Sequence, residues 1–223
     1  MTPDLKSILA RLQRSYGKPE LPPAKGPFEL VMWENACYLL ADARRQEVFE
    51  SLRERVGLTA DAIWQAEQST LLELARRGGM RPETRVFRWR EIARITRTEF
   101  GGDLDSVLAR PFAEAKRALC KFPNLGQPGA EKILMQCGKA QGLPLESNGC
   151  RVLLRLGFGR PQKSYGGAYR SIQEVIAGQI PQSAESITRA HVLLRTHGKE
   201  TCKTTAPACA SCCLVSLCPA AQP

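Results

Sequence analysis

The stretch from residue 202 to residue 218, CKTTAPACASCCLVSLC, contains five of the nine cysteines of this 223-residue chain. Four of them, Cys202, Cys209, Cys212 and Cys218, have the spacing C-x6-C-x2-C-x5-C. This spacing is compact enough for four thiolates to surround one centre. Four thiolates can bind either a [4Fe-4S] cluster or a structural zinc ion, because both accept tetrahedral sulfur ligation. The segment lacks the paired CxxC units that favour zinc.

The remaining cysteines do not extend this pattern. Cys213 directly follows Cys212 but does not fit the spacing of the four candidate ligands, so we expect that it does not bind the metal. The other four lie in apolar, helix-like settings that favour buried, unreactive thiols; they are Cys37, Cys120, Cys137 and Cys150.

The first residues of the chain indicate the cellular compartment. Lys6, Arg11 and Arg14 interrupt the apolar residues of this segment, so it lacks the continuous apolar core of a signal peptide. No stretch approaches the length of a membrane span. We therefore expect a reducing compartment, such as the bacterial cytoplasm with its nucleoid, where clustered thiols indicate metal or redox chemistry more than disulfides.

Composition and periodicity predict an all-α fold with a polyanionic partner. Apolar residues make up 43% of the chain, and 32 Lys and Arg against 22 Asp and Glu give a net charge of +10. Such a charge favours binding to nucleic acid. Apolar residues recur at helical intervals almost throughout, and no run has the alternation of a strand. Helices are predicted over 27–43, 44–56 and 82–100, among others.

A second motif lies at residues 122–133, FPNLGQPGAEKI, where a tight turn joins two predicted helices. Gly126 allows close approach to the backbone, and Pro128 suits the first position of the second helix. Exposed amides at the start of that helix can bind a phosphate. Alone, the segment would also fit an ordinary interhelical loop.

Together, the cysteine spacing, its lead-in His197 to Cys202 and the glycine-containing turn resemble the endonuclease III and MutY superfamily of DNA glycosylases. The resemblance covers roughly residues 27–219. It implies a two-lobed, all-α helix-hairpin-helix fold with a C-terminal [4Fe-4S] cluster bound by the four cysteines. It also implies a monomer that binds double-stranded DNA at a damaged, mismatched or abasic nucleotide, with that nucleotide rotated out of the stack.

The resemblance also implies two lobes. One is a six-helix lobe containing the hairpin, over residues 31–140. The other is a cluster lobe built from residues 1–30 and 141–223. Within this arrangement, the residues expected to bind DNA are Leu125, Gly126, Gly129, Arg151 and Lys203. The duplex-opening glutamine of endonuclease III aligns near Leu39, where a core leucine is the plainer reading.

The position of the catalytic lysine differs from the family pattern. In relatives that also cleave the strand, a lysine follows the hairpin glycine at the position occupied here by Pro128. A proline side chain cannot form a Schiff base with the sugar, so the sequence predicts a monofunctional glycosylase. Lys132, one helical turn further on, is the possible alternative nucleophile, although a surface or phosphate-binding lysine is the simpler interpretation.

Two glutamates are the candidate catalytic acids. Glu146 aligns with the catalytic aspartate of the family and could stabilise the cationic sugar and orient or deprotonate a water molecule. It could also simply cap the following helix. Glu34 aligns with the base-protonating glutamate of MutY, and partial burial against Val31 and Met32 would favour its protonated form. An exposed helical glutamate is the alternative for Glu34.

Three functions are consistent with the sequence. The leading hypothesis is a base-excision repair glycosylase, a hydrolase with weak or absent lyase activity, that cuts the N-glycosidic bond of a damaged or mismatched base. The second is a bifunctional glycosylase and abasic-site lyase. The third is a non-catalytic protein that binds DNA structure. The altered catalytic positions favour the monofunctional glycosylase and leave open that the protein is not an enzyme.

Overall fold

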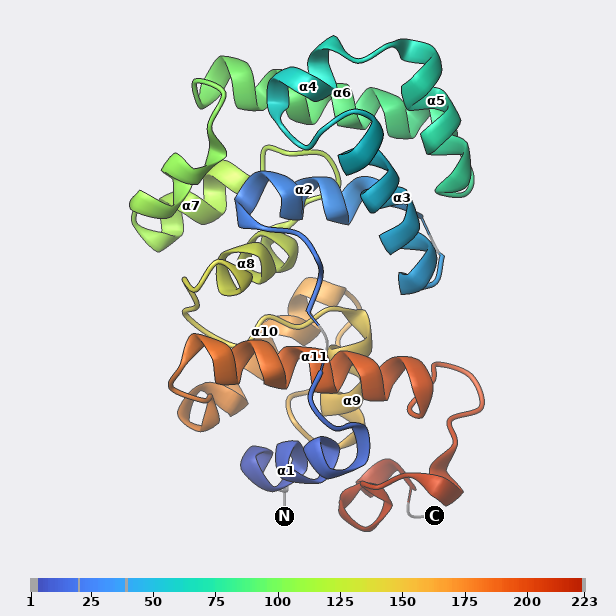
Figure 1. Cartoon of the computed structure of the whole chain (residues 1–223). Coiled ribbons are helices and arrows are strands. Elements are labelled where there is room, and N and C mark those ends of the chain that lie inside the picture. Colours follow the sequence, from blue (N-terminus) through green and yellow to red (C-terminus); the bar gives the residue numbers. More distant parts are fainter. Residues whose placement is uncertain (1–3, 20, 39, 222–223) are drawn as a thin grey trace. The chain divides into compact units, whose positions relative to one another are not determined.

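The computed structural model describes residues 4–19, 21–38 and 40–221, and these residues form helices and loops without any strand (Figure 1). The predicted all-α fold is therefore confirmed. Among the described residues, no helix is both long enough and apolar enough to cross a membrane. The chain divides into two compact units: Pro22–Lys139, called here the hairpin unit, and Met1–Leu21 with Ala140–Pro223, called the cysteine unit.

The hairpin unit contains seven α-helices among its described residues. They are α2 (Gly26–Ala36), α3 (Asp42–Arg55), α4 (Ala60–Gln65), α5 (Gln68–Arg77), α6 (Pro82–Glu99), α7 (Phe112–Leu119) and α8 (Gln127–Gln136). A short 3-10 helix, η1 (Leu104–Ala109), precedes α7. The resemblance implies six helices in this lobe, and the described residues of the hairpin unit form seven α-helices; the first turn of α4 is capped by Thr59.

The core of the hairpin unit forms around α2 and α6, which pack against each other. Helix α2 is buried on nearly all sides, and its residues Met32 and Trp33 contact a core that includes Phe49 and Trp89. The Trp89 indole donates a hydrogen bond to the carbonyl of Asn35. Because α2 and α8 also pack together, the first helix of this unit supports the hairpin from within.

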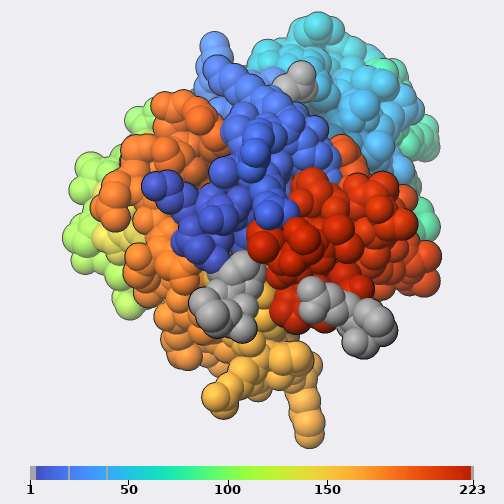
Figure 2. Space-filling model, turned by 90° about the horizontal axis from the view of Figure 1, so that it is seen from below, coloured from blue at the N-terminus to red at the C-terminus, as the bar shows by residue number. Residues whose placement is uncertain are grey.

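The cysteine unit is built from the two ends of the chain. It contains α1 (Leu5–Tyr16), α9 (Ser147–Arg155), α10 (Tyr165–Ile176) and α11 (Ala184–Glu200). Helix α11 packs against both α9 and α1, and three short 3-10 helices follow it: η3 (Cys209–Ser211), η4 (Val215–Leu217) and η5 (Pro219–Ala221). The dark blue N-terminal helix lies against the red C-terminal loop in Figure 2. Arg11 of this helix donates a hydrogen bond to Ser216 Oγ of the loop at 2.8 Å.

Two sequence predictions differ from the structure. The helix predicted over 27–43 ends at Ala36, because Cys37 adopts an extended backbone and a new helix begins at Asp42. The predicted lobe boundary between residues 30 and 31 falls inside α2, whereas the structure divides the chain between Leu21 and Pro22. Helix α2 belongs wholly to the hairpin unit because its apolar residues are part of that unit's core.

Candidate functional site

The hairpin between α7 and α8 has the turn expected from its sequence. Phe122 is buried, and its carbonyl accepts the Leu125 amide at 3.2 Å, which closes the turn. Asn124 adopts a left-handed backbone with φ of 61°, a conformation that asparagine tolerates better than most residues. Gly126 is the N-cap of α8, and Pro128 lies in its first turn.

Neither the backbone conformation nor the packing within the hairpin unit requires a glycine at position 126. Its φ of −87° suits any residue. A Cβ placed there would meet only the Pro128 ring, at 3.9 Å, which is ordinary contact. A Cβ at Gly129, in contrast, would lie 3.1 Å from Leu125. The first residue therefore keeps an outer surface open, whereas the second permits close packing inside the hairpin.

The Leu125 side chain is too buried to make the predicted contact with DNA itself. It is only 6% exposed and belongs to the core of the hairpin unit. Its role is to fix the turn, so any contact from this position to a partner involves the backbone. No side chain caps α8, and the amides of its first turn therefore remain potential donors.

Lys132 and Glu34 form an ion pair within the hairpin unit. Lys132 Nζ lies 2.6 Å from Glu34 Oε2, and the two side chains are only 16% and 18% exposed. Neither residue is therefore the freely exposed surface charge considered as the simpler interpretation. The pair joins α8 to α2, and the two candidate catalytic residues neutralise each other.

Glu146 caps α9 of the cysteine unit. Its Oε1 accepts the Gly149 amide at 2.8 Å, and its Oε2 accepts the Asn148 side-chain amide at 2.7 Å. The capping role considered from the sequence is thus present. A carboxylate offers about four lone-pair positions. Two bonds leave further acceptor capacity, so capping does not prevent Glu146 from binding a water molecule or facing a cationic sugar.

A hydrogen-bond network connects Glu146 to the cysteine loop. Asn148, which donates to Glu146, accepts a bond from Arg151 at 2.7 Å. Arg151 also donates to the carbonyls of Gly198 at 2.7 Å and Cys202 at 2.9 Å. These three bonds occupy much of the guanidinium. These bonds fix the start of α9 against the loop, and the phosphate contact of Arg151 stays a prediction.

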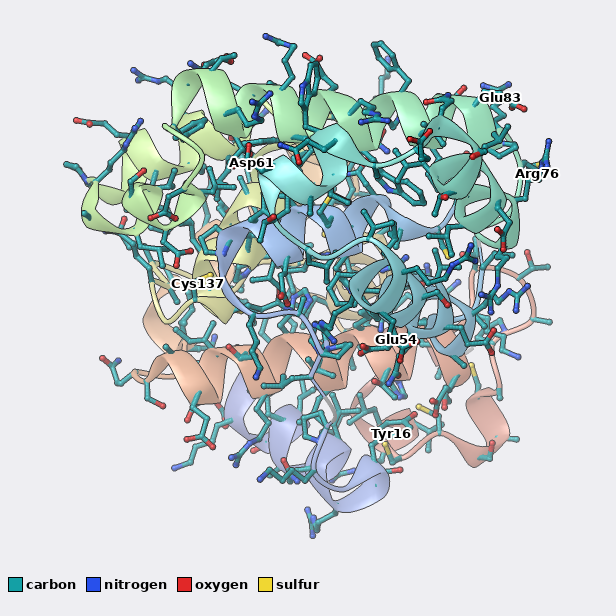
Figure 3. All side chains as sticks on the ribbon, turned by 45° about the horizontal axis from the view of Figure 1, so that its top comes forward. Tyr16, Glu54, Asp61, Arg76, Glu83 and Cys137 are labelled. Carbon is teal, nitrogen blue, oxygen red and sulfur yellow. The ribbon has the colours of Figure 1, made fainter. Side chains whose placement is uncertain are left out.

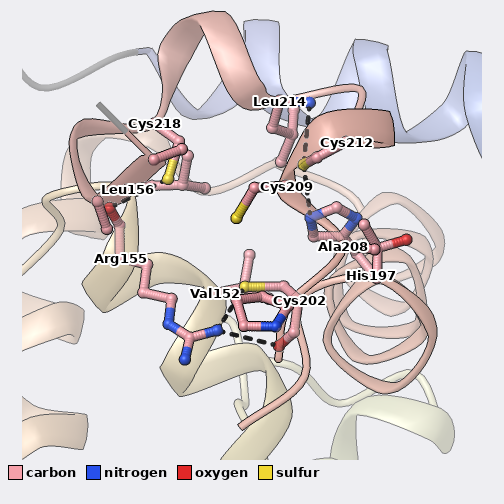
Figure 4. Close-up of a pocket in the computed structure, with 14 residues that line it drawn as sticks. Val152, Arg155, Leu156, His197, Cys202, Ala208, Cys209, Cys212, Leu214 and Cys218 are labelled. Atoms are coloured by element: carbon pink, nitrogen blue, oxygen red, sulfur yellow. Dashed lines mark hydrogen bonds between the residues drawn. The ribbon is translucent and has the colours of Figure 1, made fainter. Parts of the chain in front are cut away.

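The four candidate ligand cysteines line one cavity of about 170 Å³ in the cysteine unit (Figure 4). All four are free thiols and partly buried. Figure 4 shows the sulfur atoms of Cys202, Cys209, Cys212 and Cys218 distributed around the cavity. Among the residues that the structure describes, no group of three or more His, Cys, Asp or Glu side chains is arranged to hold a single metal ion.

Polar groups surround these sulfur atoms. Arg155 Nη1 lies 3.2 Å from Cys202 Sγ, which places a positive charge beside one candidate ligand. Cys212 Sγ accepts the Leu214 amide at 3.4 Å and lies 3.6 Å from His197 Nε2. Burial lowers the pKa of His197 to about 4, so its ring is neutral at neutral pH. The cavity is thus lined by four thiols together with an arginine and a neutral histidine.

Of the four cysteines outside the loop, Cys37 and Cys150 are buried as predicted, whereas Cys120 and Cys137 are only partly buried. Burial raises the pKa of Cys37 and of Cys120, and it raises the pKa of Cys137 and of Cys150 to about 11. A thiol with such a pKa carries less than about one thousandth of its population as reactive thiolate near neutral pH.

We therefore expect iodoacetamide near neutral pH to leave these four thiols unmodified in the folded chain. Peptide mass spectrometry after a short exposure would measure the modification at each position. The same reaction in denaturant, where every thiol is solvated, provides the control. Modification of Cys150 at equal rates in the folded and denatured chains would contradict its burial.

Two further residues named in the sequence analysis are Lys203 and Leu39. Lys203 is exposed in the loop after Cys202, so its side chain can reach a partner. Leu39 lies outside the described residues. Sequence reasoning missed the bridging role of Asn148 and the contact between Arg155 and Cys202. The spacing of Asn148 and Arg151, three residues apart on one helix, was the available signal for the first.

Comparison with known proteins places this geometry in context. No family model matches the chain. It is 27% identical to Endonuclease III of Sulfolobus acidocaldarius over 172 residues, which cover 76% of this chain and 71% of that protein. A solved non-covalent Endonuclease III–DNA complex matches with a TM-score of 0.77 at 20% identity, covering 97% of this chain and 94% of that one. A thermostable thymine-DNA glycosylase matches with a TM-score of 0.73 at 14% identity, covering 97% and 96%.

The fold and the site define an all-helical helix-hairpin-helix protein with a four-cysteine loop near its C-terminus. Two independent likenesses, in sequence and in structure, agree on the same relatives. The chain is similar in sequence to Endonuclease III at modest identity, and it shares the fold of the solved Endonuclease III structure.

Proposed function

We propose that this protein is a monofunctional DNA glycosylase of base-excision repair, which hydrolyses the N-glycosidic bond of a damaged or mismatched base in double-stranded DNA. The observation that carries the proposal is the fold likeness, over 97% of the chain, to Endonuclease III captured on DNA. The name of the thymine-DNA glycosylase that shares the fold supports the same reaction class. The net charge of +10 supports DNA as the partner.

The hairpin supplies a means of holding the DNA backbone. Gly126 leaves the outer surface of the turn open, and the first turn of α8 has no side-chain cap. Backbone amides at such a helix start can bind a phosphate through hydrogen bonds and the positive end of the helix dipole. Gly129 supports this arrangement indirectly, because it lets Leu125 pack beneath the turn.

Glu146 is the residue that we assign to the chemical step. In hydrolysis, a water oxygen forms a bond to the sugar C1′ while the base leaves with the electron pair of the glycosidic bond. A carboxylate near C1′ stabilises the positive charge that develops on the sugar and accepts a proton from the water. Gly149 and Asn148 hold both carboxylate oxygens in place, and Arg151 in turn holds Asn148. Such support reduces the reorganisation needed in the transition state.

The pairing of Glu34 and Lys132 argues against a general-acid role for Glu34 and against a nucleophilic role for Lys132. A general acid must carry a proton, whereas Glu34 faces an ammonium group at 2.6 Å as an ion-paired carboxylate. A Schiff-base nucleophile needs a free electron pair, which the paired ammonium of Lys132 does not offer. With Pro128 after the hairpin glycine, the described residues of the hairpin offer no unpaired amine at this turn.

We further propose that Cys202, Cys209, Cys212 and Cys218 bind a [4Fe-4S] cluster. The four thiols line one cavity of the cysteine unit. Their C-x6-C-x2-C-x5-C spacing lacks the paired CxxC units that favour zinc. A bound cluster would cross-link the loop that follows α11.

The proposed function is tested by single-turnover base release on a panel of duplexes. The panel contains uracil, thymine glycol, an oxidised purine, an alkylated base, a mismatch and an abasic site. Release of a free base from at least one duplex, with an intact abasic strand as the product, is the expected result. Tight binding without product across the whole panel would instead indicate a non-catalytic binder of DNA structure.

The absence of lyase chemistry gives a separate prediction. With borohydride present on abasic DNA, we expect no covalent adduct from this chain, because Pro128 cannot form an imine and Lys132 is ion-paired. The variant Pro128→Lys places a primary amine at the turn and provides a matched comparison. An adduct in the natural chain that disappears in Lys132→Ala would contradict the prediction and favour a bifunctional enzyme.

A further inference from the structure

The segment that leads into Glu146 is buried and lies outside any helix. Residues 143–146 have no regular secondary structure, and Pro144 favours an extended backbone at the residue before it. Leu143 and Leu145 are 0% and 1% exposed, and Pro144 is also buried. Because a buried carbonyl without a partner is costly, the carbonyls of these three residues need donors from elsewhere in the fold.

Three side chains of the cysteine unit supply one donor for each of these carbonyls. The carbonyls of residues 143, 144 and 145 accept hydrogen bonds from Gln173 Nε2 at 2.6 Å, His191 Nδ1 at 2.7 Å and the Tyr165 hydroxyl at 2.5 Å, respectively. Since a carbonyl oxygen can only accept, the His191 ring carries a proton on Nδ1. Two of the donors come from α10 and one comes from α11, so both helices hold the segment.

The peptide bond between Leu145 and Glu146 connects these donors to the residue that we assign to the chemical step. A peptide unit is planar, so a bond that fixes the Leu145 carbonyl also fixes the orientation of the Glu146 amide. On the other side, the Glu146 carbonyl accepts the Cys150 amide at 2.9 Å, and its carboxylate accepts the Gly149 amide at 2.8 Å. The backbone of Glu146 is therefore held from both directions.

Close packing at the start of α9 limits movement of the same segment. A Cβ at Gly149 would lie 3.3 Å from the Leu145 side chain and 3.7 Å from Leu194 of α11. Glycine at this position thus lets the first turn of α9 approach both neighbours closely. The position of Glu146 consequently depends on contacts with α10 and α11, and not on the cap of α9 alone.

We infer that Tyr165, His191 and Gln173 are positioning residues, which fix residues 143–145 and thereby hold the Glu146 carboxylate in the orientation that base release requires. This inference rests on the proposed function, in which Glu146 acts at the sugar. The influence of each donor decreases with the distance of its carbonyl from Glu146 along the chain. Tyr165 therefore has the largest effect, and Gln173 has the smallest.

Tyr165→Phe is the first test, because it removes one hydroxyl and keeps the ring. We expect single-turnover base release to be about tenfold slower, with an unchanged Kd for duplex DNA, since a small displacement of a reacting group is costly. For Gln173→Leu we expect a decrease of about twofold. Ser171→Ala is the control on the same helix, because Ser171 Oγ accepts the Arg160 amide at 3.0 Å instead. It should lower stability and leave base release unchanged.

A double-mutant cycle separates positioning from a general loss of stability. If Tyr165 acts through the Glu146 carboxylate, Tyr165→Phe slows base release by less than about twofold in the Glu146→Gln background, where that carboxylate is already absent. Glu54→Gln provides the matched background, because Glu54 is an exposed residue of α3 (Figure 3). There, Tyr165→Phe should keep its full effect. Equal slowing in the two backgrounds would overturn the inference.

Amide hydrogen exchange of Gly149, measured by NMR, reports on Glu146 without a substrate. The Gly149 amide bonds to the carboxylate, so we expect its exchange to be about threefold or more faster in Tyr165→Phe and unchanged in Ser171→Ala. If the natural chain releases a base but neither exchange nor base release responds to Tyr165→Phe, only the positioning role fails. If the natural chain releases no base while exchange responds, the proposed function fails and the structural link from Tyr165 to Glu146 remains.

Discussion

Glu146→Gln is expected to lower single-turnover base release by roughly 10²–10⁴-fold on a duplex that the natural chain processes. Glutamine keeps the length of the side chain but cannot carry the negative charge that stabilises the sugar cation or accept a proton from water. Its carbonyl can still accept the Gly149 amide, so most of the α9 cap remains. Quench-flow measurement with enzyme in excess over DNA separates this chemical step from product release.

Two further variants separate chemistry from structure at Glu146. Glu174→Gln neutralises an exposed glutamate on α10 of the same unit and should leave base release unchanged. Glu146→Asp keeps the charge on a shorter side chain and should retain more activity than the glutamine variant. The unfolding free energy of Glu146→Gln should fall by only about 1–2 kcal/mol, the value of a lost hydrogen bond at a cap. Unchanged base release in Glu146→Gln would exclude the proposed mechanism.

Cys212→Ser is expected to cause the largest loss of stability. Serine oxygen is a poor substitute for thiolate sulfur in an iron-sulfur cluster, so iron and sulfide content should fall sharply. Binding free energy at a structural metal site contributes directly to folding. The C-terminal loop contains only short 3-10 helices, so under the proposed cluster assignment we expect its folding to depend on the bound group more than on helix packing. We expect a loss that is a large part of the roughly 5–15 kcal/mol typical of a folded domain.

The neighbouring cysteine provides the control for this experiment. Cys213 is adjacent to Cys212 but does not line the cavity, so Cys213→Ser should retain metal content and melting temperature. Metal analysis of the purified natural chain distinguishes four irons with sulfide from one zinc. An unchanged melting profile in Cys212→Ser would show that the loop does not need a bound group to fold.

The Glu34 and Lys132 pair shows how the tertiary structure changes an interpretation that was based on the sequence. Each residue had a plausible catalytic role from its position in sequence. Their separation of 98 residues gave no sign that they would meet, because a partner on another helix is set by packing. Once the two charges lie 2.6 Å apart, each changes what the other can do.

Arg151 shows the same effect for a single side chain. A basic residue on an amphipathic helix is commonly a solvated charge, and a phosphate contact was a reasonable expectation from the sequence. In the folded chain, its donors reach Asn148 and two carbonyls near the cysteine loop. Asn148 lies on the same helix as Arg151, whereas the carbonyls of Gly198 and Cys202 belong to α11 and the loop after it, which only the tertiary structure brings to α9.

The sequence by itself determined the helical class, the hairpin turn and the four-cysteine spacing, because these depend on local periodicity, turn residues and short-range ligand geometry. Tertiary structure decided which candidate residues remain free to act. It buried Leu125, paired Lys132 with Glu34 and brought side chains of two helices to the carbonyls of residues 143–145, contacts that no local pattern indicated. The physical reason is that burial and charge pairing depend on contacts between distant segments, which form only when the helices pack.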